Sequence, residues 1–514
     1  MKNMIAVDVK SKKADPLKCV CDVLCVGVWA GEKLDKFASQ VDVALAGGIL
    51  KLITLGDFKG SAATSALLYG NDSMAAKRVL VVGLGEKKKA KIDTVRNSAS
   101  LASFKAVDIK AEKVCMAMHY AFDGKFDIAQ VGQAIAEGIY MGSYRYDEFL
   151  SEDKKDVRVE RIVFEIAESD PDKLKQMLKG VGFGVVIGQA QNFARTLCNR
   201  PANYVFPQVF ADEAKKLAKQ TEGLSCAVFD EKQLEAKGMG GIVAVGKGSS
   251  NKPRMIILKY TPKVKMADKL ATVGLIGKAI TFDSGGISLK PGEGMDEMKM
   301  DMTGGAAVLG AMKAIAELGP GVNVYGVICS AENSPSGESY RPGDIITTYS
   351  GKTVEILNTD AEGRMVLCDG IAYAKELGCE PIVDIATLTG ACVVALGKHK
   401  AGLMGNDDKL IKQLQEASVK SGEALWHMPC GDEYAEDMKS KIADLKNTGG
   451  KWGGSCTAGS FLGEFAGETK WAHLDIAGKM DASSEPMKKI MSAGSLGFGV
   501  RLFVAFIDEL AKRK

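Results

Sequence analysis

The sequence predicts an α/β fold with two α/β domains, and three observations support that prediction. The chain has 514 residues, which is more than one ordinary hydrophobic core accommodates. Strand-like apolar runs alternate with helical stretches along the chain. In the longer C-terminal part the apolar runs are continuous, which is typical of strands that are buried on both faces of a sheet.

The first predicted domain covers residues 1–168. A short alternating apolar stretch opens it, which predicts a first strand and not a secretory signal, so we expect a cytoplasmic protein. Gly83 and Gly85 follow a strand-like run, but position 88 is lysine. We interpret this stretch as a tight turn, because the dinucleotide-binding fingerprint is incomplete. The charged stretch at 151–160 is interpreted as a solvated loop.

A helical stretch at about residues 170–198 stops near Pro201, which cannot continue a helix. We interpret residues 169–200 as a linker helix and residues 201–514 as the second domain. Continuous apolar runs predict the strands of the second domain, at residues 254–260, 270–277, 322–333 and 381–390. Between them, two helical stretches end at glycine, a common helix C-cap, at residues 304–319 and 362–378.

The composition excludes few classes of protein. Hydrophobic residues make up 46% and charged residues 25% of the chain, the usual balance of a globular protein. The net charge of +3 argues neither for nor against nucleic acid. No apolar run reaches the roughly 18 residues that a transmembrane helix needs. The 12 cysteines are scattered, so we expect buried thiols rather than disulfides.

Cysteine and histidine do not supply a metal site. Cys19, Cys21 and Cys25 cluster, but no second Cys/His pair follows at zinc-ribbon spacing. The four histidines are too far apart for a two-histidine zinc motif, and we interpret His473 as a core residue. Carboxylates must therefore supply most of the ligands of any metal site.

Three polar clusters in the second domain carry the candidate chemistry. The first contains Lys278, Asp283 and Lys290. The second contains Asp301, before a glycine pair and a helix. The third reads "NTDAEGR" and contains Asp360, Glu362 and Arg364. Ligands of open α/β sheets bind beyond the carboxyl ends of the strands, so we expect the clusters to meet at one sheet edge.

Each residue alone has an ordinary structural interpretation. Asp301 is placed like a helix N-cap, Asp283 like a turn residue, and Lys278 like a lysine that snorkels off a strand end. Together, four carboxylates at one sheet edge cannot all stay ionised without compensation. Two divalent cations would supply it, and carboxylate-rich two-metal sites are a recognised device of hydrolases.

These clusters resemble those of the cytosolic leucyl aminopeptidases, the M17 peptidase family. The "NTDAEGR" motif is highly specific, and the spacing from Lys278 to Arg364 also matches. The resemblance extends through "DIATLTGA", "FLGEF" and "WAHLDIAG" and covers nearly all of residues 170–514, whereas the N-terminal domain matches mainly in layout. It implies a smaller macro-like N-terminal domain, joined by a long helix to a larger catalytic domain with a central mixed sheet.

The resemblance implies metal-binding roles for five of these residues. Asp283 and Glu362 bridge two divalent ions. Lys278 and Asp301 complete the tighter site, and Asp360 completes the looser, exchangeable one. Oxygen ligands suit Mn²⁺ or Mg²⁺, whereas the nitrogen ligand makes Zn²⁺ or Co²⁺ plausible, so the sequence leaves the metal open. A lysine binds a metal only as a neutral amine, so Lys278 must lose its proton there.

The other roles concern catalysis and substrate. Lys290 stays cationic and polarises the substrate or its tetrahedral intermediate. Arg364 holds a bicarbonate ion that acts as general base, for which the two parallel donors of a guanidinium are suited. The residues that line the first substrate pocket are Met298, Thr387, Leu388 and Gly390. Ala279 and Met365 replace a common glycine and leucine of the family, which are small apolar changes that leave the chemistry in place.

The sequence therefore predicts a metal-dependent leucyl aminopeptidase that acts on short peptides with a free N-terminus. The resemblance implies a homohexamer, and we expect neither a membrane nor a nucleic-acid partner. Two alternatives stay open. One is a two-metal phosphoesterase, although that enzyme would not need an apolar first pocket. The other is an added DNA-binding regulatory role at "GEKKKAKI" (85–92), a stretch that we interpret instead as a solvated loop.

Overall fold

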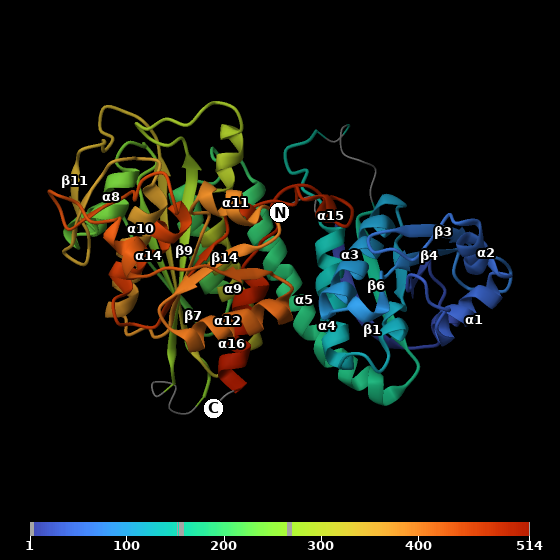
Figure 1. Cartoon of the computed structure of the whole chain (residues 1–514). Helices are drawn as coiled ribbons and strands as arrows, with labels where there is room; N and C mark the ends of the chain where they lie inside the picture. The colour runs from blue at the N-terminus through green and yellow to red at the C-terminus, as the bar shows by residue number, and fades with distance from the viewer. Residues whose placement is uncertain (1–4, 152, 154–158, 265–269, 513–514) are drawn as a thin grey trace. The chain divides into compact units, whose positions relative to one another are not determined.

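The computed structural model describes residues 5–151, 153, 159–264 and 270–512. The chain forms two compact units, of which the first contains residues 1–192 and 482–493 and the second residues 193–481 and 494–514. Helix α5 (Pro171–Asn199) is the long helix expected after the first domain, and it runs from the first unit into the second (Figure 1). The boundaries at 168 and 200 stay predictions. The start of the first predicted strand and part of the loop at 151–160 lie outside the described residues.

The first unit is built on one sheet with the strand order β1-β6-β5-β2-β4-β3. Neighbouring strands run parallel, except that β3 pairs antiparallel with β4 at the edge. Its strands are β1 (Ala6–Lys13), β2 (Val23–Val28), β3 (Ser65–Tyr69), β4 (Arg78–Gly83), β5 (Lys113–Met116) and β6 (Arg161–Glu168). Its helices are α1 (Lys36–Ala44), α2 (Gly48–Leu55), α3 (Ile92–Asp108), α4 (Ile128–Ser143) and the short α15 (Glu485–Lys488).

The sequence of this unit explains its packing. All six residues of β2 are buried, as expected of a continuous apolar run between two neighbours. Helices α3 and α4 pack together closely because α4 carries glycine where they meet. A Cβ atom added at Gly142 would lie 2.0 Å from the carbonyl oxygen of Ser100. Gly85 has a φ of +77° just after β4, so the tight turn predicted there is confirmed.

The second unit contains an eight-stranded mixed sheet with the order β15-β14-β17-β13-β9-β10-β8-β7. Its central strands run parallel: β17 (Trp471–Asp475), β13 (Ile382–Ala386), β9 (Thr272–Asp283) and β10 (Asn323–Asn333). The outer strands are β7 (Leu224–Phe229), β8 (Arg254–Tyr260), β14 (Ala401–Gly405) and β15 (Leu425–His427). A small second sheet contains β11 (Ile345–Thr347), β12 (Thr353–Glu355) and β16 (Leu445–Lys446). The expected mixed sheet is thereby confirmed.

Two helices position the candidate site, α9 (Thr303–Leu318) and α10 (Glu362–Glu376), and both pack against β9 and β10. The main remaining helices of the unit are α6 (Pro207–Gln220), α7 (Glu231–Ala236), α8 (Gly240–Gly246), α11 (Gly390–Leu396), α12 (Asp408–Ser421), α13 (Asp432–Glu436), α14 (Gly454–Ala466) and α16 (Val500–Lys512). The twelve cysteines are free thiols, and all except Cys226 and Cys430 are buried, as expected.

In the described part of the chain, no single helix has the length and apolar character to cross a membrane. Helices α1 and α2 meet those criteria only as a pair, and the pair is bent by 100°.

Candidate active site

The candidate site lies at the carboxyl ends of the parallel strands of the second unit. Asp283 is the last residue of β9, and Asn333, the last residue of β10, is its partner in the strand register. Thr387 follows directly after β13. Strand ends that are neighbours in a parallel sheet bring their next side chains to one edge, so segments distant in sequence meet here.

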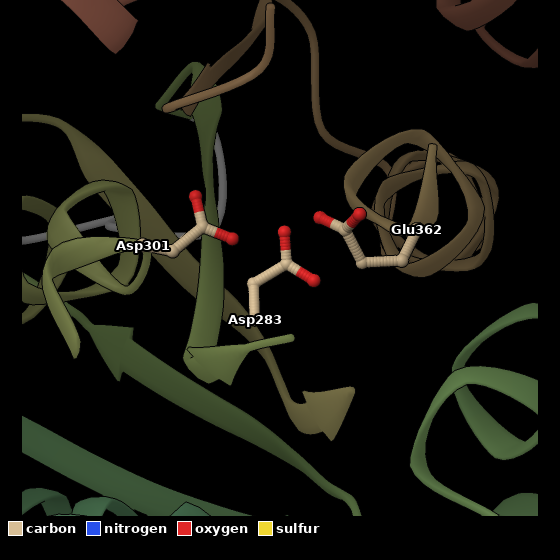
Figure 2. A group of neighbouring side chains, drawn as sticks. All are labelled: Asp283, Asp301 and Glu362. Atoms are coloured by element: carbon tan, nitrogen blue, oxygen red, sulfur yellow. The ribbon is translucent and has the colours of Figure 1, made fainter. Parts of the chain in front are cut away.

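Three carboxylates share this edge. Each of Asp283, Asp301 and Glu362 has a carboxylate oxygen within 4.8 Å of the others. Figure 2 shows the Asp283 carboxylate between those of Asp301 and Glu362. Their exposed fractions are 3%, 4% and 1%. Asp301 is not a helix N-cap, because Met302 caps α9 and Asp301 ends the preceding 3₁₀ helix (Met295–Met300). That ordinary interpretation is therefore wrong.

Lys278 lies among these acids and does not snorkel to solvent, since it is only 2% exposed. Its Nζ atom is 2.8 Å from Asp301 Oδ2 and 2.8 Å from Glu362 Oε1. It also donates a hydrogen bond of 2.8 Å to the carbonyl oxygen of Thr387. Gly363 makes room for this side chain, because a Cβ atom there would lie 2.8 Å from Lys278 Nζ.

Lys290 connects the cluster to the fourth predicted acid. Its Nζ atom is 2.9 Å from Asp283 Oδ2 and 2.5 Å from Asp360 Oδ1. Asp360 is not one of the three clustered acids, and its side chain is 32% exposed. The structure therefore brings the four predicted acids to one edge, with Asp360 on the more open side.

The charges at this edge perturb one another strongly. Burial, and after it the charge of Asp283, raises the pKa of Glu362 to about 8. Burial raises the pKa of Asp301 to about 6, although Lys278 opposes that shift. Burial alone would lower the pKa of Lys278, but the charges of Asp301, Glu362 and Asp283 outweigh it and raise the pKa. The four acids at this edge therefore outnumber Lys278 and Lys290, the two lysines that pair with them.

The donor set fits divalent cations. Buried carboxylate oxygens are the ligands of oxygen-rich metal sites. The Oε2 atom of Glu362 is buried and makes no hydrogen bond with any described residue. A buried polar atom without a partner is costly, and a bound cation would remove that cost. On the other side of the site, Asp283 Oδ1 accepts a hydrogen bond of 2.8 Å from the side-chain amide of Asn333 and one of 3.0 Å from the backbone N–H of Gly285.

Arg364 lies behind Glu362 on the first turn of α10 and is 8% exposed. Its Nη1 atom donates a hydrogen bond of 2.8 Å to the carbonyl oxygen of Asn447. Its Nε atom is buried and has no hydrogen-bond partner among the described residues. Burial lowers the pKa of Arg364 to about 10. A guanidinium with an unused buried donor is suited to hold an anion.

The predicted substrate residues differ in their contacts with the acid cluster. Thr387 donates a hydrogen bond of 2.6 Å to Asp301 Oδ1, so it supports the acid cluster directly. Leu388 is half-buried and packs against the core of the unit. The carbonyl oxygen of Met298 accepts a hydrogen bond of 3.2 Å from the backbone N–H of Asp301, whereas no side-chain hydrogen bond connects Met298 or Gly390 to the cluster among the described residues. Their role in a substrate pocket stays a prediction.

Two residues of the site were missed by sequence reasoning. Asn333 orients Asp283, as described above, and also donates a hydrogen bond of 3.0 Å to the carbonyl oxygen of Thr359. Thr359 donates a hydrogen bond of 2.6 Å to the carbonyl oxygen of Gly285 and so ties the "NTDAEGR" segment to the loop after β9. The sequence did contain a signal for Asn333, because this polar residue ends an apolar run that predicts a buried strand.

The comparisons with known proteins decide the family. The model of the cytosol aminopeptidase family, catalytic domain, matches residues 192–504. The model of the N-terminal domain of the same family matches residues 25–153. The chain belongs to the cytosol aminopeptidase family. The M17 resemblance stated above is thereby confirmed.

Relatives from this family align with nearly the whole chain. A probable cytosol aminopeptidase of Geotalea uraniireducens is 41% identical over 498 residues, which cover 96% of this chain and 98% of the relative. One from Chlorobium limicola is 43% identical over 469 residues, which cover 89% and 91%. As a member of the cytosol aminopeptidase family, the protein is a metal-dependent aminopeptidase, and therefore a hydrolase.

Solved structures give the same result. A tomato leucine aminopeptidase mutant superposes with a TM-score of 0.88 at 32% identity and covers 99% of this chain and 98% of its own. The bottromycin maturation enzyme BotP, solved in complex with Mn, superposes with a TM-score of 0.82 at 33% identity and covers 95% and 99%. The fold expected from the resemblance, a smaller N-terminal domain and a larger catalytic domain, is confirmed.

Proposed function

We propose that this aminopeptidase uses two divalent ions to remove leucine or another apolar residue from the N-terminus of short peptides. One observation carries the proposal. Three buried carboxylates lie within 4.8 Å of one another, and an oxygen of one of them, Glu362 Oε2, has no hydrogen-bond partner among the residues that the structure describes. Such an arrangement is stable only with additional positive charge.

The residues divide between two ion sites. Asp283 and Glu362 would be shared by both ions, Lys278 and Asp301 would complete the tighter site, and Asp360 the looser one. The exposure of Asp360 supports that division, because an open site exchanges its ion more readily. Bound ions supply Lewis acidity toward a scissile carbonyl and lower the pKa of water. Lys278 would give up its proton on ion binding, since an ammonium has no lone pair for a cation.

Two cations of the chain act on the reacting groups. Lys290, 23% exposed at its side chain, would release its contacts with Asp283 and Asp360 and place its positive charge beside the substrate carbonyl. Arg364 would hold bicarbonate through its unused Nε donor, and that anion would take a proton from water. Removal of one such electrostatic stabiliser typically lowers the rate by about 10²–10³-fold.

The preference for an apolar residue rests on Met298 and Leu388, which a phosphoesterase would not need. The basic stretch near residue 88 gives little support to a DNA-binding role, because Glu86 pairs with Lys89 at 2.6 Å and with Lys88 at 3.8 Å. We further propose a homohexamer in the cytoplasm, which the names of the relatives and the family resemblance support. Mn²⁺ is the first ion to test, because the structure of BotP was solved with Mn.

The free α-amino group of the substrate gives the sharpest test. We expect cleavage of Leu-Gly-Gly and none of its N-acetylated form, measured with excess Mn²⁺. The neutral amine increases as pH rises through its pKa of about 7.7–8.0, so kcat/KM should climb between roughly pH 6.5 and 8.5. Comparable cleavage of both peptides would exclude an aminopeptidase of this type. Turnover of p-nitrophenyl phosphate without peptide cleavage would favour the phosphoesterase.

A further inference from the structure

The first unit has a pocket that peptide hydrolysis does not use. It has a volume of about 460 Å³ and lies beyond the carboxyl ends of β2 and β4. Two hydrogen bonds join the chain segments at its floor. The N–H of Ala30 donates to the carbonyl oxygen of Gly85, and the N–H of Leu84 donates to that of Val28, both at 2.9 Å. This sheet edge is where parallel α/β sheets bind ligands, and the volume suits a small organic molecule.

One wall of the pocket is apolar and the other is polar. Ala30, Ala62 and Leu84 contribute carbon surface. The opposite wall is the first turns of α3, labelled in Figure 1, with the side chains of Thr94, Asn97 and Ser98. Helix α3 is 17 residues long, and the N-terminus of a helix carries a partial positive charge.

The charges around the pocket leave one cation free. Glu86 is paired with Lys89 at 2.6 Å. Asp93 is paired with Arg96 at 2.6 Å and also accepts a hydrogen bond of 2.9 Å from Asn97. Lys91, the residue before α3, lines the pocket and makes no ion pair with any described residue. The lining carries two acids and two lysines and so has no net charge, but both acids are paired, which leaves Lys91 available to an anion.

Ser98 supplies the observation that points to a ligand. It lines the pocket and is 6% exposed. Its hydroxyl makes no hydrogen bond with any described residue. A serine inside a helix commonly bonds back to the preceding turn. Ser103 of the same helix does so, at 3.0 Å from the carbonyl oxygen of Ser100. The hydroxyl of Ser98 is thus available to a molecule in the pocket.

We propose that this pocket binds a small phosphate monoester. Its phosphate lies at the N-terminus of α3, near Lys91, and its organic group packs against Ala30 and Leu84 and reaches the hydroxyl of Ser98. The lining offers lysine, which binds phosphate as a point charge, and no arginine. The volume of about 460 Å³ leaves room for a group larger than a free anion.

The test is calorimetric titration of adenosine 5′-monophosphate into the full chain freed of metal, so that phosphate cannot bind to ions at the active site. We expect one site per chain and no binding of adenosine, which has no phosphate. Lys91→Gln should weaken binding by about tenfold or more, the usual effect of losing a hydrogen bond to a charged group. Ser98→Ala should weaken it by several-fold on the same grounds.

Two control variants locate the binding. Lys88→Gln removes a neighbouring lysine that is outside the pocket lining and paired with Glu86, so affinity should not change. Arg364→Ala removes the anion-binding candidate of the second unit, and affinity should again not change. The proposal is overturned by no binding at millimolar nucleotide, by loss of binding in Arg364→Ala, or by equal loss in Lys88→Gln and Lys91→Gln. Tighter binding of a single-stranded oligonucleotide, with steep salt dependence, would overturn it in favour of nucleic acid.

Discussion

Two groups of buried acids in the second unit differ in how their oxygens are satisfied. Asp384 accepts a hydrogen bond of 2.7 Å from Trp471 Nε1 and pairs with His473 Nδ1 at 2.5 Å. Asp369 accepts hydrogen bonds from the backbone N–H groups of Tyr349 and Ile242, at 2.8 and 2.9 Å. At the sheet edge, Glu362 has an oxygen that no group in the described part of the chain hydrogen-bonds, and it faces further carboxylates.

The difference separates stability from function. Asp384 and Asp369 are surrounded by donors that serve no other purpose, so they hold segments of the fold together. The acids of the site repel one another and are incompletely compensated, which is an arrangement that the fold keeps only at a cost. His473 belongs to the first group and is fully buried, which agrees with its interpretation as a core residue. Burial alone therefore does not mark an acid as functional. A carboxylate oxygen that lacks a hydrogen-bond partner and faces other carboxylates does.

The largest effect is expected at Glu362. Glu362→Gln keeps the size of the side chain but removes a charge that both ions would share, so kcat should fall by at least about 10³-fold. The folded metal-free chain should lose little stability at neutral pH, because the pKa of about 8 keeps Glu362 mostly protonated there and glutamine is likewise neutral. Peptide hydrolysis and urea unfolding measure the two effects. Full activity of Glu362→Gln would show that Glu362, like Asp384, stabilises the fold and does not take part in catalysis.

The opposite result is expected at Asp384. Asp384→Ala leaves His473 and Trp471 without their partner, and breaking a buried pair from one side costs about 3–5 kcal/mol of unfolding free energy. The kcat of the folded fraction should stay near that of the unmutated chain. Asp384→Asn is the matched control, since it can still accept the hydrogen bond from Trp471. Loss of kcat at unchanged stability would contradict the division into two groups.

The cations of the site should affect rate and not metal content. Lys290→Ala is expected to lower kcat by about 10²–10³-fold. Arg364→Ala should lower it less, because another base can replace bicarbonate. Metal analysis of both variants should match the unmutated chain, since neither residue is a proposed ligand. Full kcat in Lys290→Ala would show that its assigned role is wrong.

A smaller effect is expected from pH. The pKa of Glu362 is raised from 4.5 to about 8 in the folded chain without metal. A raised pKa of an acid stabilises the fold below its ordinary value, and that contribution is lost as pH rises from about 4.5 to about 8. Metal binding needs the deprotonated acid, so it becomes more favourable over the same range. Added Mn²⁺ should therefore raise Tm more at pH 8.5 than at pH 6, and this difference should shrink in Glu362→Gln.

The sequence predicted most of the fold because continuous apolar runs mark buried strands wherever they lie. It also predicted that the three charged clusters meet at one sheet edge, because each lies near the end of a predicted strand or before a predicted helix. Strand β9 continues to Asp283, so Lys278 lies inside the strand and not after it. It did not predict Asn333, since that role depends on the register between β9 and β10. The N-cap interpretation of Asp301 was wrong, because a 3₁₀ helix precedes α9 and moves the cap by one residue. A substrate pocket depends on side-chain packing between distant segments, which local patterns do not encode.

The number of ions bound per chain tests the central claim most directly. The chain is stripped with a chelator and dialysed to equilibrium against excess Mn²⁺, and its bound metal is measured as the excess over the dialysate. We expect about two ions per chain, one held tightly and one exchangeable. Asp360→Ala should keep the tight ion and lose the exchangeable one, whereas Asp301→Ala should weaken the tight one more. Fewer than about one ion in the unmutated chain, or an unchanged content in both variants, would contradict the two-metal account.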